Sequence, residues 1–155
     1  EMYTGIIDLK NPSYWPEAKK IAADNGLSIP MMCASPDFTH PDAAFRREQV
    51  QREIRWIDMT AELGGAYCRV LSGQRRPELS REAGLAFAAE CISACLDHAA
   101  ACNVTLILEN HYKDNYWDYP EFAQSTDMFC DLVSRIDSPQ FGVRKKRKRF
   151  LQKHS

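Results

Sequence analysis

Residues 104–112 read VTLILENHY, and this stretch decides how the rest of the chain is interpreted. Five residues suited to a buried β-strand are followed at once by a carboxylate, an amide, an imidazole and a phenol. An isolated buried charge is costly, so the carboxylate of Glu109 must be solvated, paired or bound to a metal ion. Which of these three applies is the first functional question that the sequence raises.

Strand-like and helix-like patterns alternate along the chain. The strand-like segments are residues 4–9, 27–33, 66–71, 104–109 and 140–143. The amphipathic, helix-like segments are residues 15–25, 43–63, 80–102 and 126–136. This alternation predicts an α/β fold with a parallel sheet and right-handed crossovers. Periodicity fits both an open doubly wound sheet and part of a barrel, and no glycine-rich phosphate-binding motif follows a strand.

Length and composition exclude several classes of protein for this chain. The 155 residues suit one domain, but a complete eight-stranded α/β barrel needs ~250 residues. The apolar fraction of 45% excludes a disordered chain. No apolar run approaches the ~20 residues of a membrane span, and the first residues lack the features of a signal peptide. The six cysteines lie in apolar patterns without a C-x-x-C pair, which favours reduced thiols in a cytoplasmic protein.

The charge is divided unevenly along the chain. Residues 144–153 hold seven of the 20 Lys and Arg residues, which leaves 13 against 21 acidic residues and a formal charge of −8 for residues 1–143. A basic tail can bind nucleic-acid phosphates in a salt-sensitive manner. Because the body is acidic, we favour a solvated tail over nucleic-acid binding.

Polar side chains follow several predicted strands, at the end where ligand sites form in parallel α/β folds. These residues are Asp8, Lys10, Ser35, Asp37, His40, Arg69, Ser72, Glu109, Asn110 and His111. Strand ends are generally polar, so the pattern alone does not establish a site. His40 and His111, taken singly, are better explained as surface or hydrogen-bonded histidines.

Glu109 is the sharpest candidate in this group. Strand alternation places it on the same face as Thr105 and Ile107. If that face looks into a barrel, Glu109 lies at the rim, where it could ligate a divalent cation or act as a general base. An ion pair with Arg69 on the neighbouring strand is an equally good interpretation.

Two further groups have both a functional and a structural interpretation. Cys95, His98 and Cys102 lie at i, i+3 and i+7 of one predicted helix, so zinc is conceivable, but a structural zinc site uses four ligands. Buried thiols that face the sheet are favoured. The aromatic residues of the loop after Glu109 fit a sugar-stacking lid or a loop that packs its own rings; they are Tyr112, Tyr116, Trp117 and Tyr119.

The order of elements, RVLSG at residues 69–73 and LILENH at residues 106–111 resemble the xylose isomerase-like barrels. That family includes sugar phosphate isomerases and epimerases and related endonuclease-type proteins. The resemblance covers residues 4–143 and implies a partial (β/α)8 TIM barrel with strands two to five and the start of strand six. We therefore assign residues 1–143 to the partial barrel and residues 144–155 to a disordered basic tail.

The resemblance also implies the chemistry of the site. The Glu that ends the fifth strand is a metal ligand and an acid/base carboxylate in this family, and Glu109 matches it. His111 matches a position near the substrate, and we assign substrate binding to His111, Arg69 and His40. The other family ligands are an Asp, a His and a Glu on strands six to eight, segments that this sequence does not contain. Oxygen ligands favour Mn²⁺ or Mg²⁺ over Zn²⁺.

The sequence departs from the family after residue 143. Six successive cations, RKKRKR, cannot continue a strand into a barrel core, because alternate side chains would be buried unpaired. We interpret the change as a frameshift or a truncated reading, which the DNA beyond codon 143 would test.

These features lead us to expect a metal-dependent isomerase or epimerase that acts on a sugar or sugar phosphate. We expect this chain to be an incomplete fragment of such an enzyme, with weak or no activity. The alternatives are an endonuclease-like protein that uses the basic tail, and an association module that uses open sheet edges.

Overall fold

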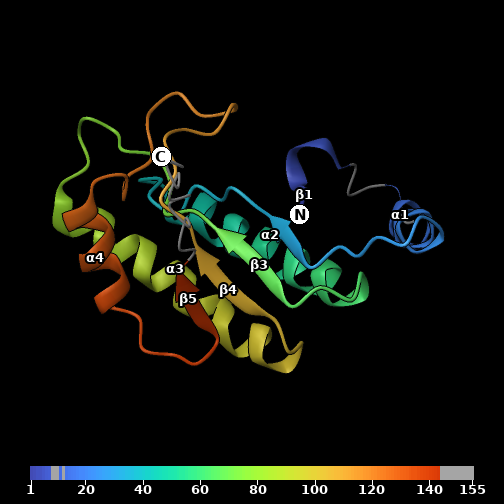
Figure 1. Ribbon diagram of the computed structural model, residues 1–155. Coiled ribbons are helices and arrows are strands. Elements are labelled where there is room, and N and C mark those ends of the chain that lie inside the picture. Colours follow the sequence, from blue (N-terminus) through green and yellow to red (C-terminus); the bar gives the residue numbers. More distant parts are fainter. Residues whose placement is uncertain (8–10, 12, 144–155) are drawn as a thin grey trace, which may run out of the picture.

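The computed structural model describes residues 1–7, 11 and 13–143 (Figure 1). Its five strands form one parallel sheet in the order β1-β2-β3-β4-β5. The strands are β1 (Met2–Tyr3), β2 (Met31–Cys33), β3 (Tyr67–Val70), β4 (Thr105–Leu108) and β5 (Phe141–Val143). A doubly wound sheet reverses its strand order part-way across, whereas this order runs in one direction, as the wall of a barrel does. The partial barrel is thereby confirmed, and the doubly wound alternative is wrong.

The helices follow the predicted segments closely. They are α1 (Tyr14–Asp24), α2 (Ala43–Glu62), α3 (Arg81–Ala101) and α4 (Thr126–Ser134), with a 3-10 helix η1 at Thr4–Ile6. Asp42 caps α2 by accepting a hydrogen bond from the backbone N–H of Ala44 at 2.8 Å, and Ser80 caps α3 in the same way. α2 and α3 cover one side of the strands (Figure 1).

α2 and α3 also end in the same way. The residue after each C-cap has a positive φ, +78° at Gly64 and +54° at Asn103. The following N–H then bonds back into the last turn, as Gly65 does to the carbonyl of Thr60 at 2.8 Å. Such an ending satisfies carbonyls that the helix leaves unpaired and directs the chain straight into the next strand.

The two faces of the sheet differ in burial. Met32, Cys68 and Leu106 lie in one row of the register and are 0% exposed, because they face the helices. Strand alternation directs the neighbouring rows to the opposite face, where Tyr67 is 46% exposed. The second face carries Arg69 in the same row as Ile107. This is the face that looks inward in a barrel, as the sequence predicts for Glu109.

Two strands begin more than one residue away from the predicted position. The strand predicted at residues 4–9 is wrong at its start, because the strand is Met2–Tyr3 and residues 4–6 form a turn of 3-10 helix. The strand predicted at 27–33 begins only at Met31, because Pro30 has no N–H to donate to a ladder. Asp8, Lys10 and the basic tail at 144–155 lie outside the described residues.

The six cysteines form no disulfide in the part of the chain that the structure describes, and four of them are buried. Among the described helices, none is both long and apolar enough to cross a membrane.

Candidate active site

The Arg69 side chain joins the carboxyl ends of three neighbouring strands. Its Nε donates to the carbonyl of Ala34 at 3.2 Å and its Nη2 to Ser35 Oγ at 2.9 Å. Its Nη1 donates to Glu109 Oε2 at 3.1 Å, just beyond the end of β4. Of the interpretations left open for Glu109, the ion pair with Arg69 is therefore the one found. The side chains of this pair are each only 9% exposed.

A cleft of about 460 Å³ opens over this ion pair. It is lined by Glu1, Tyr3, Cys33, Arg69, Glu109, His111, Lys113, Asp114 and Asn115. Three of the four residues that the sequence singled out therefore meet in one place: Glu109, Arg69 and His111.

His40 lies elsewhere. Its ring stacks on that of Phe45, with centroids 4.1 Å apart, and its Nδ1 accepts a hydrogen bond from the backbone N–H of Asp42 at 3.1 Å. It lines neither this cleft nor the larger one described below. The substrate-binding role assigned to His40 stays a prediction, and the contacts seen are those of the hydrogen-bonded alternative.

Glu121 fixes the backbone around His111, a role that no pattern in the sequence indicated. Its side chain is fully buried, and Oε1 accepts hydrogen bonds from the N–H and the hydroxyl of Ser72, both at 3.1 Å. Its Oε2 accepts from the N–H of His111 at 2.6 Å. Burial raises the pKa of Glu121 to about 7, although these hydrogen bonds oppose the rise. The chain that follows β3 is thus tied to the chain that follows β4.

The rest of the aromatic loop packs close to the same point. Phe122 is 1% exposed and its ring lies directly over Gly84 of α3, where a larger side chain would not fit. Trp117 is also buried, whereas Tyr112 and Tyr116 are more than two-thirds exposed. The loop therefore buries some of its aromatic rings and exposes its tyrosines to solvent.

A second, larger cleft of about 630 Å³ lies beside the first, and Tyr3 and Asp114 line both. The Tyr3 hydroxyl donates to Asp114 Oδ2 at 2.9 Å, and burial together with this carboxylate raises the pKa of Tyr3 to about 12.

Asp37 also lines the larger cleft, and its carboxylate forms an ion pair with Arg76 at 2.6 Å. Burial alone would raise the pKa of Asp37, but its hydrogen bonds outweigh burial and lower it. Since Glu109 and His111 lie only in the smaller cleft, that one is the candidate active site.

The described residues do not by themselves complete a divalent-metal site at Glu109. Within the described chain, the one cluster of three potential ligands gathers at Asp58, His98 and Cys102, away from Glu109. At Glu109 the neighbouring positive charge belongs to Arg69. A metal ion bound here would therefore need ligands that this part of the barrel does not supply.

Residues 5–144 match the sequence model of the family described as the xylose isomerase-like TIM barrel, so the chain belongs to that family. No curated protein matches this sequence.

Solved structures with the same fold support this assignment. A protein from Sinorhizobium meliloti 1021 is 26% identical, with a TM-score of 0.63 over 83% of this chain and 46% of its own. A D-tagatose 3-epimerase-like protein is 16% identical, with a TM-score of 0.73 over 86% of this chain and 50% of its own. The D-psicose 3-epimerase of Clostridium cellulolyticum H10 is 16% identical, with a TM-score of 0.66 over 83% and 46%. The chain thus spans about half the length of these structures.

Proposed function

We propose that this chain carries the proton-transfer carboxylate of a sugar isomerase or epimerase, in which Glu109 acts next to a substrate carbonyl. The observation that supports this most is the meeting of Glu109, Arg69 and His111 in one cleft at the carboxyl ends of the strands. Active sites lie at this end in TIM-barrel enzymes. Several proteins of similar structure are named as ketose 3-epimerases, which favours a small sugar as the substrate.

The arrangement of these side chains suits the reaction. Arg69 holds the Glu109 carboxylate in a defined position at the rim, which a base needs if it is to reach a carbon-bound proton. The guanidinium is also a fixed positive charge beside the point where negative charge develops on a substrate oxygen. His111 adds an imidazole to the same cleft, and Glu121 fixes the position of its backbone.

In the family-type reaction a divalent ion, Mn²⁺ or Mg²⁺, would polarise the substrate oxygens, with Glu109 as one ligand. The described residues provide no complete site for this ion. We propose instead that this chain alone has weak or no activity and that the remaining ligands come from another half-barrel.

The proposal is tested by supplying that half. The chain would be co-expressed with the carboxyl-terminal half-barrel of a D-psicose 3-epimerase, and the complex purified with Mn²⁺. Exchange of the C3 proton of D-fructose with solvent deuterium would then be followed by NMR. We expect exchange with the complex and almost none with the chain alone.

Replacing the base gives the decisive comparison. Glu109→Gln should lower the exchange rate by about 100-fold or more, the range in which general bases contribute. Glu90→Gln, at an exposed position of α3, is the matched control and should leave the rate unchanged. Exchange that persists in Glu109→Gln, or fast exchange by the chain alone, would contradict the proposal.

A further inference from the structure

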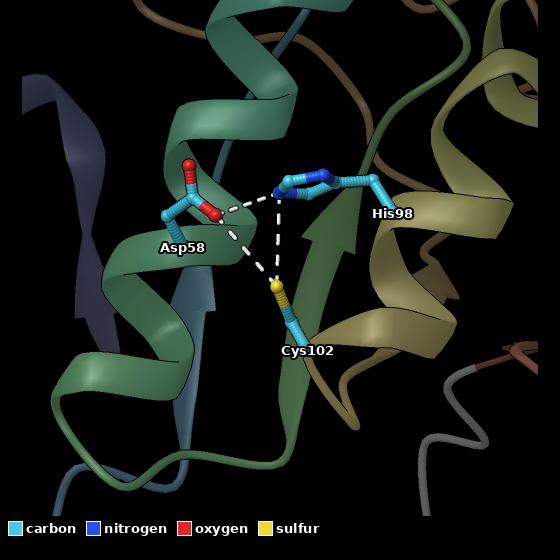
Figure 2. Close-up of side chains that lie close together, drawn as sticks. All are labelled: Asp58, His98 and Cys102. Atoms are coloured by element: carbon cyan, nitrogen blue, oxygen red, sulfur yellow. Dashed lines mark hydrogen bonds and ion pairs between the residues drawn. The ribbon is translucent and has the colours of Figure 1, made fainter.

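Three potential metal-ligating atoms meet between the carboxyl-terminal turns of α2 and α3 (Figure 2). Because each helix runs back to the amino end of the next parallel strand, this group lies at the opposite end of the sheet from Glu109. His98 and Cys102 lie four residues apart at the end of α3, so they share one face of the helix. Asp58 reaches them from α2, one turn before that helix ends. Its Oδ1 lies 2.6 Å from His98 Nε2 and 3.6 Å from Cys102 Sγ, and Sγ lies 3.6 Å from Nε2.

These distances can be compared with those of a tetrahedral zinc site. With Zn–S of about 2.3 Å and Zn–N and Zn–O of about 2.0–2.2 Å, the sulfur lies about 3.6 Å from the nitrogen and the oxygen. Both of these separations are already present around Cys102. Only the distance between Asp58 and His98 would have to lengthen, to about 3.4 Å, when zinc replaces the hydrogen bond between them.

The same geometry argues against a nucleophilic thiol. A Cys–His pair that generates a thiolate needs a ring nitrogen that accepts the thiol proton and a second nitrogen that an acid orients. Here Asp58 and Cys102 both contact Nε2 of His98, so Asp58 competes with the thiol for the same nitrogen. Burial and the charge of Asp58 also raise the pKa of Cys102, the opposite of what a reactive cysteine requires.

The surroundings hold the three side chains in place and leave them accessible. Cys102 is the C-cap of α3, where Val104 N–H bonds to the carbonyl of Ala99 at 2.9 Å and fixes the last turn. The side chains of His98 and Asp58 are 37% and 45% exposed, which leaves access for a water molecule as a fourth ligand. Among the described ion pairs, Asp58 has His98 as its partner and no Lys or Arg.

We propose that Asp58, His98 and Cys102 bind a zinc ion with one position open to water, and that this ion joins α2 to α3. A nitrogen, a sulfur and an oxygen ligand together suit zinc better than Mn²⁺ or Mg²⁺, which prefer oxygen alone. Binding releases the thiol proton of Cys102 as the Zn–S bond forms. The site is independent of the function proposed for Glu109, which lies at the other end of the sheet.

Cobalt in place of zinc provides the test. The full chain would be reduced, freed of metal with a chelator and titrated with Co²⁺. We expect one ion per chain, a thiolate-to-cobalt charge-transfer band, d–d absorption of tetrahedral intensity, and displacement of cobalt by zinc. Asp58→Ala, His98→Ala and Cys102→Ser should each weaken binding by about tenfold or more. Wild-type protein that binds no metal would overturn the proposal.

Two control variants separate this site from other ligands. Cys130→Ser removes an exposed thiol of α4, and Glu109→Gln removes the carboxylate of the candidate active site. Both should keep the cobalt spectrum and its affinity. A thiolate band that survives Cys102→Ser, or one that disappears in Cys130→Ser, would overturn the proposal.

Thermal unfolding, followed by circular dichroism, gives a second readout and shows that each variant is folded. Because zinc would bind the folded chain across two helices, it should raise the Tm of the wild-type protein and of Cys130→Ser. It should raise the Tm of Cys102→Ser and Asp58→Ala clearly less, because these variants bind zinc more weakly. An equal rise in all four proteins would contradict a site that joins the helices.

Discussion

At the carboxyl ends of the strands Glu109 is buried against Arg69, whereas at the amino ends Asp58 is 45% exposed beside His98 and Cys102. Each place has a carboxylate and a cationic or potentially cationic partner from a different element. Burial makes the first pair costly to disturb, while exposure leaves the second group free to exchange its hydrogen bond for a metal ion. The neighbour and the solvent, more than the residue type, therefore decide what a carboxylate can do.

The largest expected effect is at the buried pair. Arg69→Met leaves the Glu109 carboxylate without its guanidinium partner and should lower the free energy of unfolding by about 3–5 kcal/mol. Urea unfolding measures this. The double variant Arg69→Met/Glu109→Gln should recover most of the loss, because neither charge is then buried alone. A double variant as unstable as the single one would contradict this prediction, since lost packing and not an unpaired charge would then account for the loss of stability.

Glu53 is a buried carboxylate without such a close partner. It is 1% exposed, its Oε2 has no hydrogen-bond partner among the described residues, and burial raises its pKa from 4.5 to about 8. Between these pH values the unfolded chain ionises the group while the folded chain keeps the proton, so stability falls as the pH rises.

Glu53→Gln should therefore be more stable than the wild type at pH 9, with a smaller difference at pH 4. Urea unfolding across this range measures the difference between the two proteins. If that difference does not grow with pH, the folded chain does not keep Glu53 protonated. Glu53 would then not differ from Glu109 in the way that its burial predicts.

A smaller effect is expected where the loop rests on α3. In Gly84→Ala the new methyl group would overlap the ring of Phe122, and overpacking of this kind costs about 1–3 kcal/mol. The better helix propensity of Ala offsets up to about 1 kcal/mol of this loss. We expect a net decrease in Tm, and Ala86→Gly on the exposed face of α3 tests the propensity term alone. An increase in the Tm of Gly84→Ala would show that Phe122 is not held against the helix.

The smallest effect is expected at the exposed pair. Without metal, Asp58→Ala should change the free energy of unfolding by no more than about 1 kcal/mol, because exposed ion pairs contribute little. Urea unfolding in the presence of a chelator measures this change beside that of Arg69→Met. If Asp58→Ala lowered the free energy of unfolding as much as Arg69→Met does, exposure to solvent would not explain the difference between the two ends of the sheet.

Much of the fold was predictable because apolar periodicity records which faces are buried. The alternation of segments located all four helices and the strand that leads to Glu109 within a few residues. The first strand was misplaced because TGIIDL has the composition of a strand, but its start turns as a 3-10 helix.

The site was predictable only in part. The position of Glu109 follows from strand alternation, and its ion pair with Arg69 was one of the alternatives. The roles of Glu121 and Asp58 depend on contacts across 49 and 40 residues, set by how loops and helices pack. No local pattern encodes such contacts. The spacing of His98 and Cys102 was visible in the sequence, but the third ligand was sought at Cys95, which is buried and bonds to the carbonyl of Cys91.

The proposed sugar site lies at the carboxyl ends of the strands, around Glu109. Its most direct test is an NMR titration of the isotope-labelled chain with D-tagatose, in which each backbone amide reports nearby binding. We predict that the shifts change with the ketose at residues 69–72 and 109–115 and that Glu109→Gln reduces the change. Chemical-shift changes confined to residues 58 and 98–102, or no changes at saturating sugar, would contradict this position of the sugar site.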